Sequence, residues 1–258
     1  MNKEPNQTDQ TFLAEIIQHQ SLSVISFILY HHQNQRDKIE FDFSLNPFSY
    51  VYRFDNKYHL FGENIWQLSS KLRWFKDNIV LTFQDKTIWN EIIDKFENFR
   101  SLDTNKPAKT YDTYITYSLT QENFSSNNLS HNSIVQIPST IHSLPKRLRH
   151  LTGGLNFGLL KKDKIISFAA APYITTHGNF KFAILRAVET DIIERRKGYA
   201  QATTSRLCNE LFTKYEIEQI FIWVEENSKA ARKMYDTIGF QEDSKILTTY
   251  CNQKKKAS

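Results

Sequence analysis

The sequence predicts a mixed α/β protein in which strands and amphipathic helices follow one another in both halves of the chain. Short apolar runs with a period of two residues precede segments whose apolar residues recur at helical spacing. In both halves these segments come in the order strand, strand, helix, strand, helix. All of the seven glycines except Gly62 lie beyond residue 150. We therefore expect two α/β halves, each with a mixed sheet flanked by helices, that do different jobs.

The boundary between the halves is expected in the stretch RSLDTNKPAKTYD, residues 100–112. This stretch is polar, contains Pro107 and lacks periodicity, as an interdomain linker does. The expected domains are residues 1–107 and residues 108–258.

The first half contains an alternating pattern on both sides of Asp55–Asn56, which is typical of a hairpin. It also contains the mainly apolar run NIVLTF at 78–83, which is typical of a buried strand. The expected elements are a helix over 8–20, a hairpin over 48–63, a helix over 64–75, a strand over 78–83, and a helix capped by Asp85 with Ile88, Ile92 and Phe96 on one face.

The second half repeats this order with longer strands. A polar region that contains Pro138 and Pro145 separates its first strand from the rest. The expected elements are a strand over 113–120, helices within 121–150, a hairpin over 155–174 that turns at 161–164, a strand over 179–190, a helix that starts near Gly198, a strand over 218–226, a helix over 228–237 that ends at Gly239, and a strand over 244–250.

Composition excludes several classes of protein. No run approaches the roughly 18 apolar residues of a membrane helix, and the longest candidate, LSVISFILY at 22–30, contains serines. The polar start, MNKEPNQTDQ, has no signal-peptide apolar region. Two cysteines, Cys208 and Cys251, cannot form a disulfide framework or a metal cluster. We expect a cytoplasmic protein without a metal or a membrane partner.

The net charge of +5 is not concentrated on one predicted face, since acidic and basic residues alternate along most of the chain. The uninterrupted basic runs are RRK at 195–197 and KKK at 254–256. A nucleic-acid-binding protein usually shows a continuous basic face. We therefore expect no nucleic-acid partner, and we interpret the excess as a local phosphate site plus a solvated tail.

The basic run at 195–197 directly precedes Gly198 and the start of a predicted amphipathic helix. The first N–H groups of a helix have no intrahelical partner and attract anions. A glycine lets an anion approach the backbone closely, and arginine or lysine adds charge-assisted hydrogen bonds. A diphosphate would fit this arrangement. The alternative interpretation is an exposed basic cluster followed by an ordinary turn.

A second motif follows the strand at 218–226. Asn227 is a suitable N-cap for the next helix, whose Ala230, Ala231 and Met234 are expected to face inward. Tyr235 lies four residues after Ala231 and shares its flank, so its hydroxyl is expected to point into the space beside these alanines. The alternative is a capped helix with a tyrosine in the core.

Together the two motifs resemble the GNAT superfamily of acyl-CoA-dependent N-acyltransferases over roughly residues 111–250. Two motifs in the right order are more specific than either alone. The last position of the first motif is often glycine in the family and is Ala200 here, and a frequent proline is replaced by Ile192. The matching residues are Arg195-x-x-Gly198-x-Ala200, Asn227-x-x-Ala230 and Tyr235-x-x-x-Gly239-Phe240.

The resemblance implies that acetyl-CoA binds the second half. The backbone after Arg195 would hold the diphosphate, the end of the preceding strand would pair with the pantetheine arm, and Asn227 and Ala230 would flank that arm. Lys233 would reach the 3′-phosphate. The expected coenzyme A-binding residues are Val188, Thr190, Arg195, Arg196, Lys197, Gly198, Tyr199, Ala200, Asn227, Ala230 and Lys233.

The resemblance also implies two catalytic groups. The backbone N–H of Val188 would polarise the thioester carbonyl, and Tyr235 would protonate the departing thiolate. The position of a catalytic glutamate found in some members is Phe182 here. The general base that deprotonates the amine therefore stays open among Glu189, His177 and a water chain.

The first half resembles the degenerate first half of two-halved GNAT members. Its corresponding loop, LFGENIWQ at 60–67, has no cation, and Glu63 would repel a phosphate. We expect this half to wall one side of the acceptor site or to mediate association, for example as a homodimer. The expected function is transfer of an acetyl group from acetyl-CoA to a small-molecule or amino-acid amine by direct attack. The alternative is a non-catalytic module that binds and senses acyl-CoA.

Overall fold

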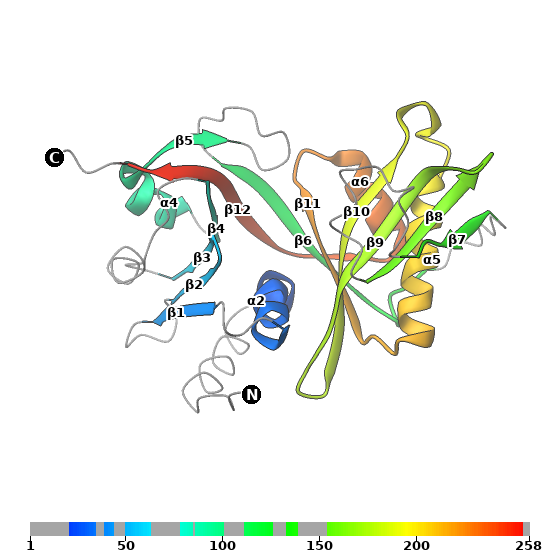
Figure 1. Cartoon of the computed structure of the whole chain (residues 1–258), viewed down its shortest axis with the longest axis horizontal. Helices are drawn as coiled ribbons and strands as arrows, with labels where there is room; N and C mark the ends of the chain where they lie inside the picture. The colour runs from blue at the N-terminus through cyan, green and yellow to red at the C-terminus, as the bar shows by residue number, and fades with distance from the viewer. Residues whose placement is uncertain are drawn as a thin grey trace. The chain divides into compact units, whose positions relative to one another are not determined.

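The computed structural model describes residues 21–34, 39–43, 50–62, 78–84, 86–100, 111–125, 133–138 and 154–254 (Figure 1). The chain splits into two compact units. The first comprises residues 1–115 and 244–258, and the second comprises residues 116–243. Strands β6 (Asp112–Thr120) and β12 (Gln241–Gln253) each have residues in both units. The sequence-based boundary at 107/108 did not anticipate that the C-terminal residues group with the first unit.

The first unit contains a sheet in which β12 pairs with β4 and with β5. Its strand order is β1, β2, β3, β4, β12, and all neighbours with a described register are antiparallel except the parallel pair β3 and β4. Its elements are α2 (Leu22–Asn34), β1 (Ile39–Phe43), β2 (Tyr50–Phe54), β3 (Lys57–Phe61), β4 (Ile79–Phe83), α4 (Lys86–Ile92), η2 (Ile93–Lys95) and β5 (Phe96–Arg100).

The core of the first unit forms where α4 and the sheet strands bring apolar side chains together. Trp89 of α4 stacks on Phe83 of β4, with ring centroids 5.5 Å apart, and both are almost completely buried. All five residues of β4 are buried, in agreement with its mainly apolar sequence, in which Thr82 is the polar residue. Cys251 of β12 lies in the same cluster, so this cysteine packs in the core.

The second unit is built on five consecutive sheet neighbours, in the order β11, β10, β9, β8, β7, with β6 next to β11. Pairing is antiparallel from β7 to β10 and parallel between β10 and β11. Its further elements are β7 (Ile134–Gln136), β8 (Leu155–Lys161), β9 (Lys164–His177), β10 (Phe180–Thr190), η4 (Ile192–Glu194), α5 (Tyr199–Lys214), β11 (Gln219–Glu225) and α6 (Lys229–Ile238).

Helix α5 packs on the strands β8, β9 and β10 (Figure 1). Leu207, Cys208 and Leu211 on its inner face are fully buried. Cys208 is therefore a core residue, and burial raises the pKa of its thiol well above the usual range. The two hairpin strands β8 and β9 are joined by a turn through Lys162 and Asp163, both with a positive φ, as the expected turn at 161–164 requires.

Most of the predicted elements that fall on described residues are confirmed within one to three residues, but two predictions are wrong. Phe96 begins strand β5 and does not continue the helix after residue 85, because α4 ends at Ile92. Residues 134–136 form a strand inside the region expected to be helical, because they pair with β8. The expected helices at 8–20 and 64–75 and the cap at Asp85 lie outside the described residues.

Candidate functional site

Strands β10 and β11 pair along only part of their length. Their parallel register joins Phe182–Ile184 to Gln219–Phe221, whereas β10 continues to Thr190 and β11 to Glu225. Within residues 154–254, the register of this pair therefore stops six residues before the end of β10. Over about 20 Å of strand, the edge of β10 that faces β11 is available to pair with an extended ligand.

A β-bulge lies in the same part of β10. Arg186 pairs with Ala170 and Glu189 pairs with Phe168, so two residues of β10 oppose one residue of β9. The two residues are Ala187 and Val188. Ala187 has a φ of 53°, which is uncommon for a residue with a side chain. The bulge leaves the half-buried Val188 outside the β9 register, as required if its N–H is to meet a ligand.

After β10 the chain turns through η4 into helix α5, as the sequence predicts. Gly198 is the N-cap residue, with φ 78° and ψ 2°, and Arg196 also has a positive φ of 62°. Gly198 has no side chain that could cap the helix. Tyr199 and Ala200 are the first helical residues and are half-buried. The first N–H groups of α5 therefore lie at this turn and have no side-chain cap. An anion site at a helix start requires such uncapped N–H groups.

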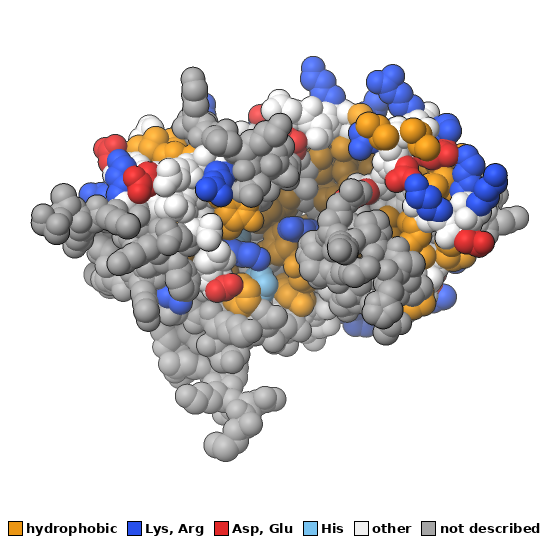
Figure 2. All heavy atoms as spheres, turned by 45° about the horizontal axis from the view of Figure 1, so that its top comes forward, with side chains coloured by type: hydrophobic (Ala, Val, Ile, Leu, Met, Phe, Trp, Pro, Cys, Tyr) orange, Lys and Arg blue, Asp and Glu red, His pale blue; other side chains and the backbone are white. Residues whose placement is uncertain are grey.

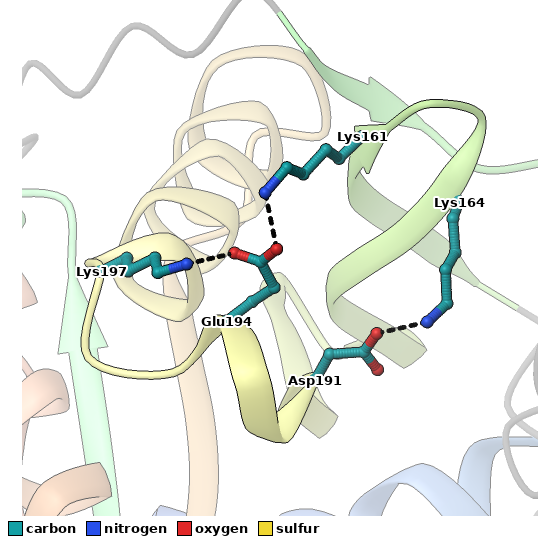
Figure 3. A network of polar contacts seen from close by, with 5 residues as sticks. All are labelled: Lys161, Lys164, Asp191, Glu194 and Lys197. Carbon is teal, nitrogen blue, oxygen red and sulfur yellow. Dashed lines mark hydrogen bonds and ion pairs between the residues drawn. The ribbon is translucent and has the colours of Figure 1, made fainter.

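A charge network holds this turn against the β8–β9 hairpin (Figure 3). The carboxylate of Glu194, whose side chain is 8 % exposed, accepts hydrogen bonds from Nζ of Lys161 and Nζ of Lys197, each at 2.7 Å. Nearby, Lys164 pairs with Asp191 at 2.8 Å. The hydrogen bonds from Lys161 and Lys197 lower the pKa of Glu194 to about 2. Glu194 is therefore charged at all physiological pH values.

Lys197 takes part in this network. It was expected to contact a diphosphate, and in the structure its ammonium group donates to Glu194. Arg195 also makes an internal contact, since its Nε donates to the carbonyl oxygen of Thr190 at 3.2 Å. The same contact occupies one backbone group of Thr190 that was expected to pair with the pantetheine arm.

The surface around the turn remains strongly basic. Arg195, Arg196 and Lys197 are all exposed. Figure 2 shows blue Lys and Arg side chains gathered at the upper right, with orange hydrophobic side chains among them. Ile192 and Ile193 are each 77 % exposed. The uncapped start of α5 therefore lies beside positively charged side chains, and Glu194 neutralises part of their charge.

The start of α6 differs from the prediction. Its N-cap is Ser228, one residue after the expected Asn227, and both Asn227 and Ala230 are exposed. Ala230 was expected to face inward and does not, because the helix begins one residue later and its buried stripe passes through Tyr235 and Ile238. Lys233, expected to reach a phosphate, is exposed on the same helix. The helix ends at Gly239, which has a φ of 107°, as predicted.

Tyr235 is buried, with 3 % of its surface exposed. Its ring packs against Phe240 at 5.3 Å and against Tyr117 at 6.3 Å between centroids. Burial, with a smaller contribution from Cys208, raises the pKa of the Tyr235 phenol well above its usual range. The phenol is therefore protonated at neutral pH, as a proton donor must be, and the ring also serves the core.

A contact that the sequence did not suggest lies beside Tyr235. Arg232 donates from Nε to the hydroxyl of Tyr117 at 3.0 Å and from Nη2 to Glu242 at 2.9 Å. Tyr117 is 1 % exposed. The pKa of Arg232 is raised mainly by its hydrogen bond to Tyr117. A second phenol, oriented by a cation, therefore packs against the predicted proton donor.

The candidate bases are placed at different ends of β10. His177 is the last residue of β9 and pairs with Phe180 of β10, which lies eight residues before Val188. That corresponds to about 26 Å, which is too far for proton transfer at the bulge. Burial lowers the pKa of His177. Glu189 lies at the bulge and is half-buried, whereas Phe182 is fully buried beside Phe221.

Sequence reasoning missed Ala187, Glu194, Lys161, Tyr117 and Arg232. A pair such as Lys161 and Glu194, 33 residues apart, leaves no local signal. Among the described residues, no group of three or more His, Cys, Asp or Glu side chains could hold a metal ion. Likewise, no helix in the described part of the chain is long and apolar enough to cross a bilayer.

Part of the second half matches a known family model. Residues 158–250 match the model of the family described as FR47-like protein. They contain β9, β10, the turn at Gly198, α5, β11 and α6, which are the elements of the candidate site. A comparison with curated proteins gives no match.

Solved structures share the fold over almost the whole chain. A Drosophila protein aligns with a TM-score of 0.66 at 11 % identity, covering 96 % of this chain and 97 % of its own. A GCN5-related N-acetyltransferase-like protein from Streptococcus suis aligns at 0.56 and 14 % identity, covering 96 % and 100 %. A GNAT-family protein from Novosphingobium aromaticivorans aligns at 0.54 and 12 % identity, covering 88 % and 96 %. The chain therefore has the fold of these GNAT-family structures, and its residues 158–250 match the FR47-like family model.

Proposed function

We propose that the protein is an acyl-CoA-dependent N-acyltransferase that moves an acetyl group from acetyl-CoA to a small-molecule or amino-acid amine. One observation carries the proposal: the part of β10 that leaves β11 contains the bulge at Ala187–Val188 and leads directly to the open start of α5. An extended strand edge suits the amide groups of pantetheine, and a helix start suits a diphosphate. The family resemblance of these segments supports the same ligand.

In the proposed reaction the neutral amine attacks the thioester carbonyl carbon while acetyl-CoA is bound. The N–H of Val188, which lies outside the β9 register, donates to the oxygen as it gains negative charge. The C–S bond then breaks, and the thiolate takes a proton from the Tyr235 phenol. A base, Glu189 or a water chain, accepts the proton of the amine. No covalent intermediate with the enzyme is required.

The diphosphate contacts are proposed for the backbone from Arg196 to Ala200, with Arg195 and Arg196 adding exposed positive charge. Lys197 contributes to this site indirectly, by holding Glu194 together with Lys161. Asn227, Ala230 and Lys233 are exposed, so they are available to the pantetheine arm and the 3′-phosphate. Residues 1–107 are proposed as the degenerate GNAT-like half.

A second candidate function is a non-catalytic module that binds acyl-CoA. The burial of Tyr235 favours it, because a phenol with 3 % exposure is explained by packing against Phe240 and Tyr117 alone. This candidate predicts the same coenzyme A site but no acceptor-dependent chemistry.

Two measurements separate the candidates. Calorimetry of coenzyme A and acetyl-CoA tests the site, and release of free thiol from acetyl-CoA in the presence of a panel of amines tests the chemistry. An acyltransferase releases thiol faster with at least one amine than without any. Binding without amine-dependent release would identify the sensing module, and absence of binding would reject both.

A further inference from the structure

Asn156 on β8 carries a buried carboxamide that has no hydrogen-bond partner among the described residues. The residue is 1 % exposed, and this holds for both Oδ1 and Nδ2. Buried polar atoms in folded proteins are nearly always paired, because leaving one unpaired reduces stability. The amide therefore costs stability unless a ligand completes its hydrogen bonds, and residues that lower stability in this way are concentrated at functional sites.

The side chain of Asn156 lies on the face of the sheet that is turned away from α5. Its neighbour Phe157 lies under the guanidinium of Arg206 on α5, at 5.8 Å from the ring centroid. A Cβ at Gly158 would point towards Ile137, which confirms that 157 and 158 face opposite sides. Since side chains alternate along a strand, Asn156 shares the face of Gly158.

On that face a row of paired residues leads from Asn156 to the end of the β10–β11 register. Asn156 pairs with Ala170 on β9, and Ala170 pairs with Arg186 on β10. Two strand spacings make this row about 10 Å long. Arg186 is exposed and comes two residues after Ile184, where the pairing with β11 stops.

The bulge opens on the same face. Ala187 packs against the cluster of Ile137, Phe168 and Ala170, and Ala170 is the residue between Asn156 and Arg186. Val188 follows one position later on β10, so its backbone lies about 12 Å from that of Asn156. A molecule with the length of an amino acid, together with the Asn156 side chain, spans this distance.

We propose that Asn156 binds the amine acceptor and selects acceptors that carry a carboxylate or carboxamide near the amine, that is, amino acids and their amides. This rests on the proposed acyltransferase function. A carboxamide offers two donors and one acceptor, so it matches a carboxylate or another amide. Arg186 belongs to the same row, through its pairing with Ala170.

The test compares acceptors that differ only in the selected group. The twenty amino acids and several amino-acid amides are assayed against the corresponding amines without the carboxyl group, such as glycine and glycinamide against methylamine. The wild-type kcat/KM is expected to be at least tenfold higher for the best amino acid or amide than for its matched amine. In Asn156→Leu this preference should fall at least tenfold, while KM for acetyl-CoA and Kd for coenzyme A stay within twofold.

A readout independent of activity accompanies this assay. Because the unpaired amide is removed, Asn156→Leu should melt no lower than wild type. Asn156→Ala removes the same carboxamide without added volume. It replaces Asn156→Leu as the test variant if the leucine strains the core. The control is Thr204→Val on α5, which packs on the opposite face of the sheet. This change removes a buried hydroxyl that has no hydrogen-bond partner among the described residues. Acceptor preference should be unchanged in this control.

The outcomes distinguish the two proposals. Amine-dependent transfer with equal use of matched amines, or with a preference that both Asn156 variants retain, overturns the role of Asn156 and leaves the acyltransferase proposal intact. A marked drop in melting temperature in both variants, with the preference retained, shows that the amide serves the fold. Absence of transfer to every amine overturns the acyltransferase proposal and this inference with it.

Discussion

Replacing Gly198 by aspartate should separate the stability of helix α5 from the affinity for coenzyme A. Gly198 has φ 78° and ψ 2°, a conformation that Asp and Asn adopt more readily than other residues with side chains. Both are also favourable N-caps, and Asp adds a favourable charge at the helix start. We therefore expect Gly198→Asp and Gly198→Asn to fold with similar melting temperatures.

The two variants should differ in binding because only one carries a charge. An aspartate at the N-cap would lie about 4 Å from an anion bound to the first N–H groups of α5. At that separation two like unit charges repel by about 1 kcal/mol in bulk water and about 4 kcal/mol near a protein surface. These energies correspond to about a 5-fold to 1,000-fold increase in Kd. The asparagine variant has the same shape and lacks this repulsion.

Calorimetry with coenzyme A at low and high salt measures this difference. The ratio of the Kd values of the Asp and Asn variants should be at least about fivefold and should shrink at high salt, where screening weakens the repulsion. Pantetheine, which lacks the phosphates, should bind both variants equally. Equal Kd values for coenzyme A in both variants at low salt would refute the placement of the diphosphate at Gly198.

Three further predictions concern Tyr235, Glu194 and Gly239. Tyr235→Phe keeps the buried ring and should lower kcat for thiol release by about 10²–10⁴-fold with little change in KM; undiminished kcat would leave the residue a packing role only. The pKa of Glu194 is lowered from 4.5 to about 2, so its ion pairs stabilise the fold above pH 4.5 and lose this effect as the pH falls towards 2. The melting temperature of Glu194→Gln should therefore lie below that of wild type at pH 7, and the gap should close under acid; a gap independent of pH would contradict this. Gly239→Ala should lower the free energy of unfolding by about 1–3 kcal/mol or more in denaturant titrations, because φ is 107° and the new Cβ would meet the carbonyl oxygen of Asn123 at 1.8 Å; an unchanged midpoint would disprove the close approach.

The sequence by itself determined the local elements of the candidate site. Apolar periodicity predicted β10, α5, β11 and α6, because the burial of one face imposes the period of each element on its sequence. Gly198 and Gly239 predicted the start of α5 and the end of α6, and both adopt the left-handed conformations that favour glycine. The family resemblance rested on the motifs at the starts of α5 and α6, in the order in which these elements occur.

The tertiary structure decided the features that depend on distant partners. Lys161 on β8 binds Glu194, 33 residues away, and no local pattern encodes that meeting. The bulge at Ala187 exists because β10 must pair with β9 on one side while it leaves β11 on the other. The C-terminal strand β12 pairs with β4 of the first unit. The register of β8 and β9 defines the face on which Asn156 is buried, without a hydrogen-bond partner among the described residues. Periodicity shows which side chains are buried, but the choice of neighbours is made by strand register and charge pairing across long sequence separations.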